Sequence, residues 1–485
     1  MELNKLIEKL DVKEKINFNP TLEIKGISYN SNTIKSDEIF VCLRGEHVDG
    51  HNFAEDAVKK GAVAILCETK LELNVPQIIV ASTEQSIAPL ADTFYESPSK
   101  DINLIGVTGT NGKTTVTHLI QRIIEATTGK CALIGTLGYK LTSDGEYKEA
   151  KHTTPQAPEL QRTLTLIKDD ANIENVSMEV SSHALVQNRV GGCQYNCAVF
   201  TNLTQDHLDY HVTMDRYFDA KALLFKRLVA GDKAIINIDD NYAEKFISTL
   251  ANGVNLYTYG IKKDADIKAE NIKFSPSGAS FDCITPNQKY EIKLSMNGMF
   301  SVYNVLAALT TAYAYDLDIE TAIKALEPLK GVAGRFEIIV EEPLVIVDYA
   351  HTPDGLKNVL NAAREITPKD SNLICVFGCG GDRDATKRPK MGSIAEELSD
   401  KIIITSDNPR SEDPQQIITD ILAGFKSTNN VIVEADRGKA LEYIKEIASE
   451  NDVVVVAGKG HEDYQILADK TIHFDDREEV RKIFA

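Results

Sequence analysis

The sequence lacks the cysteine spacings that are typical of proteins with a structural metal site. It has eight cysteines in 485 residues and no CxxC pair. Cys193 and Cys197 are separated by three residues, as are Cys375 and Cys379, without a second pair at metal-site spacing. We therefore expect buried, reduced thiols rather than a cysteine metal site.

Long apolar runs are also missing. No stretch approaches the roughly 18 apolar residues of a membrane span, and residues 1–5 do not form the charged-then-apolar pattern of a secretory leader. We expect a cytoplasmic protein that has no stable association with membranes.

Positive charge is in short supply. Lysine and arginine total 53 against 72 aspartate and glutamate residues, a formal charge of −19. This balance argues against general binding of nucleic acids or membrane surfaces, so local cations must hold any anionic substrate. The length suggests about three domains.

The strongest motif that is present is the glycine-rich segment GVTGTNGKTT at residues 106–115. It lies between an apolar strand and a helix, and glycines let backbone N–H groups approach a phosphate. Lys113 can reach the β- and γ-phosphates, and the Thr114 hydroxyl can ligate Mg²⁺. The generic motif has glycine at Val107, so this is a variant P-loop; a glycine-rich turn with a chance lysine is the alternative. We predict an ATP site.

The pattern of strands and helices predicts an α/β protein with three parts. Residues 1–98 alternate short strands and helices, and residues 96–100 form a linker. Residues 99–336 show βα alternation, which is typical of a mostly parallel sheet. A second βα series fills residues 337–485, after a glycine-rich hinge at Gly334 and Arg335.

Polar residues follow several predicted strands, where open α/β sheets bind ligands. Glu179 interrupts an apolar run, and a carboxylate in a buried strand is costly unless it has a partner. We predict that this partner is Mg²⁺; a salt bridge is the alternative. His207 lies between Asp206 and Asp209. A contact with a metal or phosphate and simple exposure to solvent explain this pattern equally well. In the second series, loops at 348–354, 378–384, 407–410 and 458–462 predict one shared crevice. The second of these lacks the final glycine of a dinucleotide loop.

Lys221 falls within the apolar stripe of a helix predicted over residues 214–229. A lysine whose ammonium reaches solvent is the usual explanation. A lysine held inside such a stripe can instead lose its charge and become a reactive amine. The residues alone leave three classes open: an ATP-dependent ligase, a P-loop kinase or switch NTPase, and, less well supported, a nicotinamide enzyme.

Taken together, the motifs resemble those of the Mur ligase family over nearly the whole chain. They are the P-loop, residues 179–183, residues 201–209, Asn304, Gly334 with Arg335, residues 348–351 and residues 407–410. The resemblance implies a small mixed α/β domain for a uridine nucleotide (1–98), a central ATPase domain (99–336) and a Rossmann-like domain for an amino acid (337–485). Val212 departs from the glycine that relatives often carry, which we interpret as a local turn change.

The resemblance also implies a reaction. ATP would phosphorylate the D-glutamate carboxylate of UDP-N-acetylmuramoyl-L-alanyl-D-glutamate, and the amine of meso-diaminopimelate would displace phosphate from the acyl phosphate. The implied setting is cytoplasmic peptidoglycan precursor synthesis, and we expect a monomer. The alternatives are an L-lysine-adding ligase and a folylpolyglutamate synthase, although the latter lacks a uridine-nucleotide domain.

By resemblance, each site residue receives a role. The nucleotide residues are Gly109, Thr110, Asn111, Gly112, Lys113, Thr114, Thr115, Asn304, Arg335, Asp348 and His351. The metal residues are Thr114, Glu179, His207 and Lys221, the last as a carbamate (N6-carboxylysine), and Lys113, Lys221, His207 and Glu179 serve catalysis. The muramoyl-peptide residues are Ser31, His47, Thr153, Thr154, Ser181, Gln187 and Arg189. The diaminopimelate residues are Arg383, Asp407, Asn408, Pro409, Arg410, Gly458 and Glu462.

Overall fold

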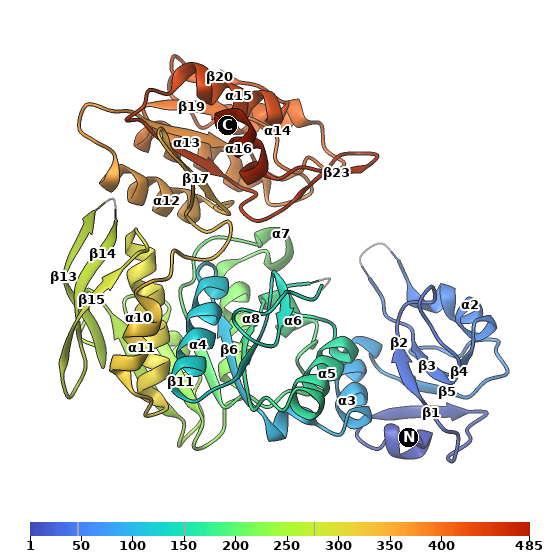
Figure 1. The fold of residues 1–485 in the computed structure, drawn as a ribbon. Coiled ribbons are helices and arrows are strands. Elements are labelled where there is room, and N and C mark those ends of the chain that lie inside the picture. Colours follow the sequence, from blue (N-terminus) through green and yellow to red (C-terminus); the bar gives the residue numbers. More distant parts are fainter. Residues whose placement is uncertain (46–47, 150–151, 276) are drawn as a thin grey trace.

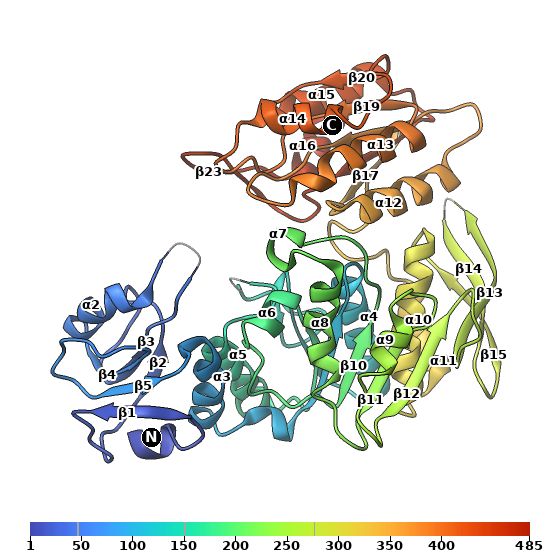
Figure 2. The same ribbon diagram turned by 180° about the vertical axis from the view of Figure 1, so that it is seen from behind.

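A computed structural model describes residues 1–45, 48–149, 152–275 and 277–485. The chain forms three lobes, each built on its own sheet, and the C-terminal lobe lies above the central one (Figure 1). Figure 2 shows from behind that the N-terminal lobe and the β13–β15 hairpins flank the central lobe on opposite sides. No helix among the described residues is both long and apolar enough to cross a membrane.

The N-terminal lobe has a five-stranded sheet in the order β1-β5-β4-β3-β2, and only the β1–β5 pair is antiparallel. Its strands are β1 (Val12–Ile16), β2 (Gly26–Ser28), β3 (Glu38–Val41), β4 (Ala62–Cys67) and β5 (Gln77–Val80). Its helices are α1 (Leu3–Leu6), η1 (Gly50–Phe53), α2 (Ala54–Lys59) and α3 (Thr83–Phe94).

The central sheet has ten strands in the order β15-β14-β13-β12-β11-β10-β6-β9-β7-β8. Its strands are β6 (Asn103–Thr108), β7 (Cys131–Gly135), β8 (Gly138–Lys140), β9 (Asn175–Glu179), β10 (Cys197–Phe200), β11 (Lys233–Asn237), β12 (Asn255–Gly260), β13 (Ile267–Ser275), β14 (Gly278–Ile284) and β15 (Lys289–Leu294). The strands from β7 to β13 along this order are parallel, as predicted, whereas β14, β15 and β8 add antiparallel hairpins.

Helices cover both faces of this sheet. They are η2 (Pro98–Asp101), α4 (Lys113–Thr127), α5 (Ala157–Thr165), η3 (Leu166–Asp170), α6 (Ser182–Val186), α7 (Leu208–His211), α8 (Met214–Phe225), α9 (Ala243–Ile247), α10 (Met299–Ala314) and α11 (Ile319–Leu326). Strand β6 carries a nearly unbroken buried run because it lies between β10 and β9 with both faces covered, so its end points directly into the P-loop.

The C-terminal lobe has a six-stranded sheet in the order β16-β17-β21-β18-β19-β20, parallel except for β16. Its strands are β16 (Glu337–Glu341), β17 (Leu344–Asp348), β18 (Leu373–Phe377), β19 (Lys401–Ile404), β20 (Val431–Val433) and β21 (Val453–Ala457), with a separate hairpin of β22 (Tyr464–Ile466) and β23 (Thr471–His473). Its helices are α12 (Pro353–Ile366), η4 (Ala385–Lys387), α13 (Arg388–Leu398), α14 (Pro414–Leu422), α15 (Arg437–Ile447) and α16 (Asp476–Phe484).

One sequence prediction about local structure was wrong. The helix that carries Lys221 ends at Phe225 rather than at residue 229. The segment 96–100 connects α3 to β6, as predicted, and contains Pro98 and Ser99, which are buried in a short 3₁₀ helix. All eight cysteines are free and buried, as predicted.

The predicted hinge is held firmly by the C-terminal lobe. Gly334 has φ +67°, its carbonyl accepts the Tyr349 N–H at 2.9 Å, and a Cβ there would lie 2.1 Å from the His461 nitrogen. Gly331 also has a positive φ, +109°, but its nearest neighbour would be 3.3 Å away.

The substitution Gly334→Ala should therefore destabilise the protein more than Gly331→Ala. Backbone strain costs each variant about 1–2 kcal/mol, and overpacking adds about 1–3 kcal/mol at Gly334 alone. Calorimetric unfolding compares the two midpoints directly. Equal midpoints would show that the hinge is not packed as described.

Candidate active site

The P-loop connects β6 to α4 and depends on two glycines. Gly109 has φ +151°, and a Cβ there would lie 1.9 Å from the Thr201 hydroxyl oxygen. Gly112 has φ +87°, and its Cβ would lie 2.5 Å from the Asn304 side-chain oxygen. Asn304, on α10, therefore touches the loop directly, which brings two separately predicted nucleotide residues together.

Two lysines converge on one backbone carbonyl of this loop. Lys113 Nζ donates to the carbonyl of Gly109 at 3.0 Å and to that of Thr110 at 2.9 Å. Lys221 Nζ donates to the same Gly109 oxygen at 2.7 Å and lies 4.6 Å from the centre of the Tyr217 ring. Lys221 is 1% exposed, so its ammonium does not reach solvent and that interpretation was wrong.

Burial affects the charge of both lysines. Desolvation lowers the pKa of Lys113, and desolvation followed by repulsion from Lys113 brings the pKa of Lys221 well below its usual value. Glu179, and to a smaller extent Asp206, offsets part of the charge on Lys113, and Asp206 offsets part of the charge on Lys221. A lysine with a lowered pKa has a larger fraction of neutral, nucleophilic amine.

A cavity of about 490 Å³ opens beside the P-loop, between the central and C-terminal lobes. The predicted site residues that line it are Thr110, Asn111, Gly112, Lys113, Thr114, Thr115, Thr153, Glu179, Ser181, His207, Asn304, Arg335, Asp348 and His351. Gly109 and Lys221 lie behind this lining, in contact with each other. The residues predicted to bind diaminopimelate do not line it.

Glu179 is buried at the end of β9 with only neutral donors on its carboxylate. One oxygen accepts the Thr136 N–H at 2.9 Å, and the other accepts the hydroxyls of Thr114 at 3.0 Å and Thr136 at 3.1 Å. Among the described residues no ion pair includes Glu179, so the salt-bridge alternative fails. A buried anion without a cationic partner fits a metal ion.

His207 belongs to a carboxylate–imidazole group that spans the two lobes. Its Nε2 lies 3.2 Å from Asp206 Oδ2, and His351 Nε2 approaches the same oxygen at 3.8 Å. Burial lowers the pKa of His207 to about 3. For Asp206 burial raises the pKa, but His207 and His351 outweigh it and the net shift is well downward.

The residues predicted to hold the muramoyl peptide form a connected group at the other side of Glu179. Arg189 donates to Gln187 Oε1 at 2.9 Å and to the Thr154 carbonyl at 3.1 Å. The Thr154 hydroxyl accepts the Ser181 N–H at 3.0 Å. Thr153 accepts the Thr136 hydroxyl at 3.2 Å. Ser31 lies apart, buried in the N-terminal lobe, and His47 is outside the described residues.

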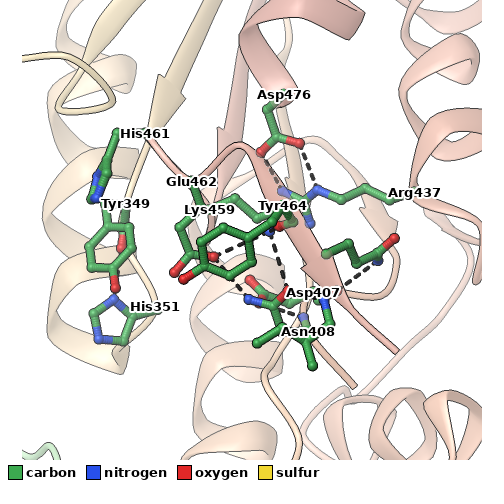
Figure 3. A network of polar contacts seen from close by, with 12 residues as sticks. Tyr349, His351, Asp407, Asn408, Arg437, Lys459, His461, Glu462, Tyr464 and Asp476 are labelled. Carbon is green, nitrogen blue, oxygen red and sulfur yellow. Dashed lines mark hydrogen bonds and ion pairs between the residues drawn. The ribbon is translucent and has the colours of Figure 1, made fainter. Parts of the chain in front are cut away.

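Asp407, Asn408 and Glu462, three of the residues predicted to bind diaminopimelate, lie close together after β19 and β21 (Figure 3), and Arg383 follows β18. The Asn408 amide donates to Glu462 Oε2 at 2.9 Å, and its oxygen accepts the Ile466 N–H at 2.9 Å. Lys459, which is fully buried, lies 3.2 Å from Glu462 Oε2 and 3.4 Å from Asn408 Oδ1. The Gly458 backbone has φ +118°, and a Cβ there would meet the Asp407 carboxylate at 2.6 Å.

Arg410 has no carboxylate partner among the residues that the structure describes. Its Nη1 donates to the Gly381 carbonyl at 2.8 Å, while neighbouring Glu412 pairs with Arg388 instead, at 2.9 Å. Desolvation, followed by repulsion from Arg383, lowers the pKa of Arg410. The surface ion pair that could have explained Arg410 is therefore absent, and its guanidinium remains available for an external anion.

The two sites adjoin at Tyr349. Its ring lies 4.3 Å from the Arg335 guanidinium carbon and 5.1 Å from the His461 ring. Arg335 Nη2 lies 3.3 Å from the Thr114 hydroxyl of the P-loop. The loop at 348–354 thus faces the cavity. The other three loops of the predicted crevice, 378–384, 407–410 and 458–462, gather on the far side of Tyr349.

Comparison with known proteins gives the family. Three family models match the chain. The model described as "Mur ligase family, catalytic domain" matches residues 23–95, "Mur ligase middle domain" matches 107–312, and "Mur ligase, glutamate ligase domain" matches 334–460. The UDP-N-acetylmuramoyl-L-alanyl-D-glutamate--2,6-diaminopimelate ligase of Listeria monocytogenes serotype 4b (strain F2365) is 45% identical, over 99% of this chain and 98% of that protein. The chain belongs to the Mur ligase family. This membership decides against a P-loop kinase and a nicotinamide enzyme.

Further relatives of this Mur ligase agree. The ligase of the same name from Clostridium botulinum (strain ATCC 19397 / Type A) is 45% identical over 100% of this chain and 99% of that protein. A solved structure of a ligase of that name is 33% identical over 100% of this chain and 99% of its own, with a TM-score of 0.68. MurF from Acinetobacter baumannii, 20% identical, shares the fold with a TM-score of 0.69 over 94% of this chain and 95% of its own.

Several residues that lie beside the predicted site residues of this Mur ligase received no role from the sequence. Asp206 and Lys459 stood inside recognised motifs but received no role, although both are charged and nearly adjacent to named residues. Thr136 follows β7 and carries no motif, so only the sheet order, which places β7 beside β9, brings it to Glu179. Arg437 and Asp476 are far apart in sequence and pair only in the fold.

Buried His211 makes the stability of the Mur ligase depend on pH. Burial, followed by the Lys221 ammonium, lowers the pKa of His211 to about 4, against about 6.5 in an unfolded chain. As the pH falls from 6.5 to 4 the unfolded state binds the proton first, so stability decreases by up to about 1.4 kcal/mol per pH unit.

We expect His211→Gln to remove this part of the slope in urea unfolding between pH 7 and pH 5. The comparison variant is His473→Gln, because Glu478 raises the pKa of exposed His473, and its small contribution has the opposite sign. An unchanged slope in His211→Gln would contradict the burial of a neutral imidazole.

Proposed function

We propose that this Mur ligase adds meso-2,6-diaminopimelate to UDP-N-acetylmuramoyl-L-alanyl-D-glutamate, with conversion of ATP to ADP and phosphate, in peptidoglycan precursor synthesis. The observation that carries the proposal is the guanidinium of Arg410, which has no carboxylate partner among the described residues and lies near the group of Glu462, Asn408 and Lys459. The names of the relatives support the same reaction.

We assign one role to each part of the chain. Residues 1–98 bind the uridine nucleotide, with Ser31 and His47 as contacts, residues 99–336 bind ATP, and residues 337–485 bind the amino acid. The group of Thr153, Thr154, Ser181, Gln187 and Arg189 holds the muramoyl peptide next to Glu179. A cytoplasmic location and a monomeric state stay predictions.

ATP fits the cavity because its negative phosphates offset the positive charge at the P-loop. Lys113 turns its buried ammonium onto two backbone carbonyls, so an anion at the loop gives it a partner of opposite charge. The N-terminus of α4 favours the same anion. When ATP binds, Lys113 exchanges its loop carbonyls for phosphate oxygens, and Asn304, Arg335, Asp348 and His351 hold the rest of the nucleotide.

Mg²⁺ fits the same site. Bound there, it would offset the charge of the two anions that must approach each other. Thr114 and Glu179 would hold it together with His207, and Mg²⁺ often takes only one or two protein carboxylates beside substrate phosphates. This agrees with the described residues, which contain no group of three His, Cys, Asp or Glu side chains that could hold a metal.

The reaction then follows in two balanced steps. A D-glutamate carboxylate oxygen bonds to the γ-phosphorus as the bond to ADP breaks, which gives an acyl phosphate. The amine of the amino acid attacks the acyl carbon, loses a proton, and expels phosphate through a tetrahedral intermediate. The positive charge of the P-loop stabilises both transition states because each one gathers negative charge.

Selection of diaminopimelate over lysine requires a cation for one extra carboxylate. Arg410 supplies a planar fork that binds a carboxylate through two hydrogen bonds, and Arg383 supplies a second charge nearby. Glu462, Asn408 and the Gly458 carbonyl suit the ammonium group, while Asp407 and Pro409 hold the loop in place. L-Lysine would leave Arg410 without a partner.

The test is phosphate release by the wild-type chain with ATP, Mg²⁺ and the UDP-muramoyl dipeptide, in parallel with diaminopimelate, L-lysine or no amino acid. We expect release in proportion to diaminopimelate. Arg410→Ala should weaken the use of diaminopimelate by roughly 2–5 kcal/mol, with KM for ATP unchanged and Arg481→Ala as the surface control. Equal use of L-lysine by the wild type would refute the assignment.

We further propose that Lys221 reacts with CO₂ as a neutral amine and releases a proton, to give a carbamate that holds metal. Lys221→Ala should then be nearly inactive, and formate or acetate should restore part of the rate by replacing the lost anion. Lys226→Ala, on the exposed side of the same helix, is the control. Unimpaired turnover in Lys221→Ala would rule the carbamate out.

A further inference from the structure

A fully buried ion pair lies beneath the acceptor loops, which we define as residues 405–410 and 458–462 (Figure 3). Arg437 Nε and Nη2 donate to the two carboxylate oxygens of Asp476, each at 2.7 Å. Both side chains are 0% exposed. Arg437 opens α15 and Asp476 opens α16, and these two helices pack against each other.

The same guanidinium also holds the backbone of both loops. Nη1 donates to the Ser406 carbonyl at 3.1 Å, and Nη2 donates to the Ala457 carbonyl at 3.1 Å. These residues immediately precede Asp407 and Gly458, where the predicted acceptor contacts begin. One rigid, planar group therefore fixes the distance between the loop that carries Arg410 and the loop that carries Glu462.

Stability alone does not explain such a pair. Taking two charges out of water is costly, and well-packed apolar side chains in their place are often neutral or stabilising. The helices α15 and α16 that carry the pair also supply Leu441, Ile444 and Val480 to an apolar core, while the charges of Asp407 and Glu462 also act on Arg437. A lysine would keep the charge of Arg437 but lacks a planar fork that reaches three partners at once.

We propose that Arg437 and Asp476 are positioning residues for the amino-acid acceptor. They set the spacing between the cationic and anionic ends of its site without touching it. This inference rests on the proposed function of the two loops, and it adds a determinant of acceptor binding that lies outside both loops.

The decisive variant is the double substitution Arg437→Met with Asp476→Leu, which removes the pair without leaving a buried charge. We expect this variant to fold, with a lower thermal midpoint because the Ser406 and Ala457 carbonyls lose their donor. KM for diaminopimelate should rise roughly ten- to a hundredfold, because small misplacements of binding groups have large effects, while kcat and KM for ATP stay within about twofold. The control is the half-exposed pair in the same lobe, Arg364 with Asp400, changed in the same way.

A second variant keeps the proposal testable if the double variant does not fold. Arg437→Lys retains the charge, and we expect a smaller rise in the same KM. Hydrogen exchange at the amides of 405–410 and 458–462 should quicken in Arg437→Lys, whichever amino acid the enzyme uses. Folded variants with unchanged KM and unchanged exchange would overturn the proposal, whereas wild-type preference for another acceptor would overturn only the proposed function.

Discussion

Two buried lysines donate to the carbonyl of Gly109, and the chemistry of the central lobe depends on this arrangement. Like charges repel strongly in a poorly solvated site, which favours a neutral amine at Lys221. Asp206 offsets part of the charge on both lysines, and Glu179 offsets part of the charge on Lys113. The opposite case lies a few side chains away, where buried Glu179 accepts only neutral donors. The site therefore holds excess positive and excess negative charge that an ATP–metal complex neutralises together.

The C-terminal lobe also contains charged groups that suit a ligand of opposite charge, in this case an amino acid. Arg410 and Arg383 have no carboxylate partner among the described residues, whereas Glu462, near Arg410, accepts from Asn408 and pairs with Lys459 at 3.2 Å. An amino acid would bring a carboxylate to the arginines and an ammonium group to the Glu462 side. The lobes meet through polar contacts: Asn111 donates to Asp354 at 3.1 Å, and Gln205 donates to Asp384 at 3.2 Å. These contacts keep the nucleotide and acceptor sites next to each other.

The sequence was sufficient to predict the βα series, the P-loop and the loops after strands, because buried parallel strands and glycine-dependent turns leave strong local patterns. It also singled out Glu179, since one carboxylate in an apolar strand is conspicuous, and the structure places this side chain next to Thr114 of the P-loop. It could not predict Thr136 or the pair of Arg437 and Asp476, because their partners lie in distant segments that only the sheet order brings together. It also did not predict that the Lys113 ammonium donates to the carbonyls of Gly109 and Thr110 in its own loop.

The central claim is that the γ-phosphoryl group of ATP is transferred to the substrate carboxylate before the amine attacks. The charged groups of both lobes therefore serve one reaction. The most direct measurement uses UDP-muramoyl dipeptide labelled with ¹⁸O in the D-glutamate carboxylate that reacts, and follows the label by mass spectrometry during turnover. The account predicts that each phosphate released carries one labelled oxygen, because the acyl carbon–oxygen bond breaks when the amine attacks. Phosphate that carries no label would show that water or the amine displaces it directly from ATP, which contradicts the account.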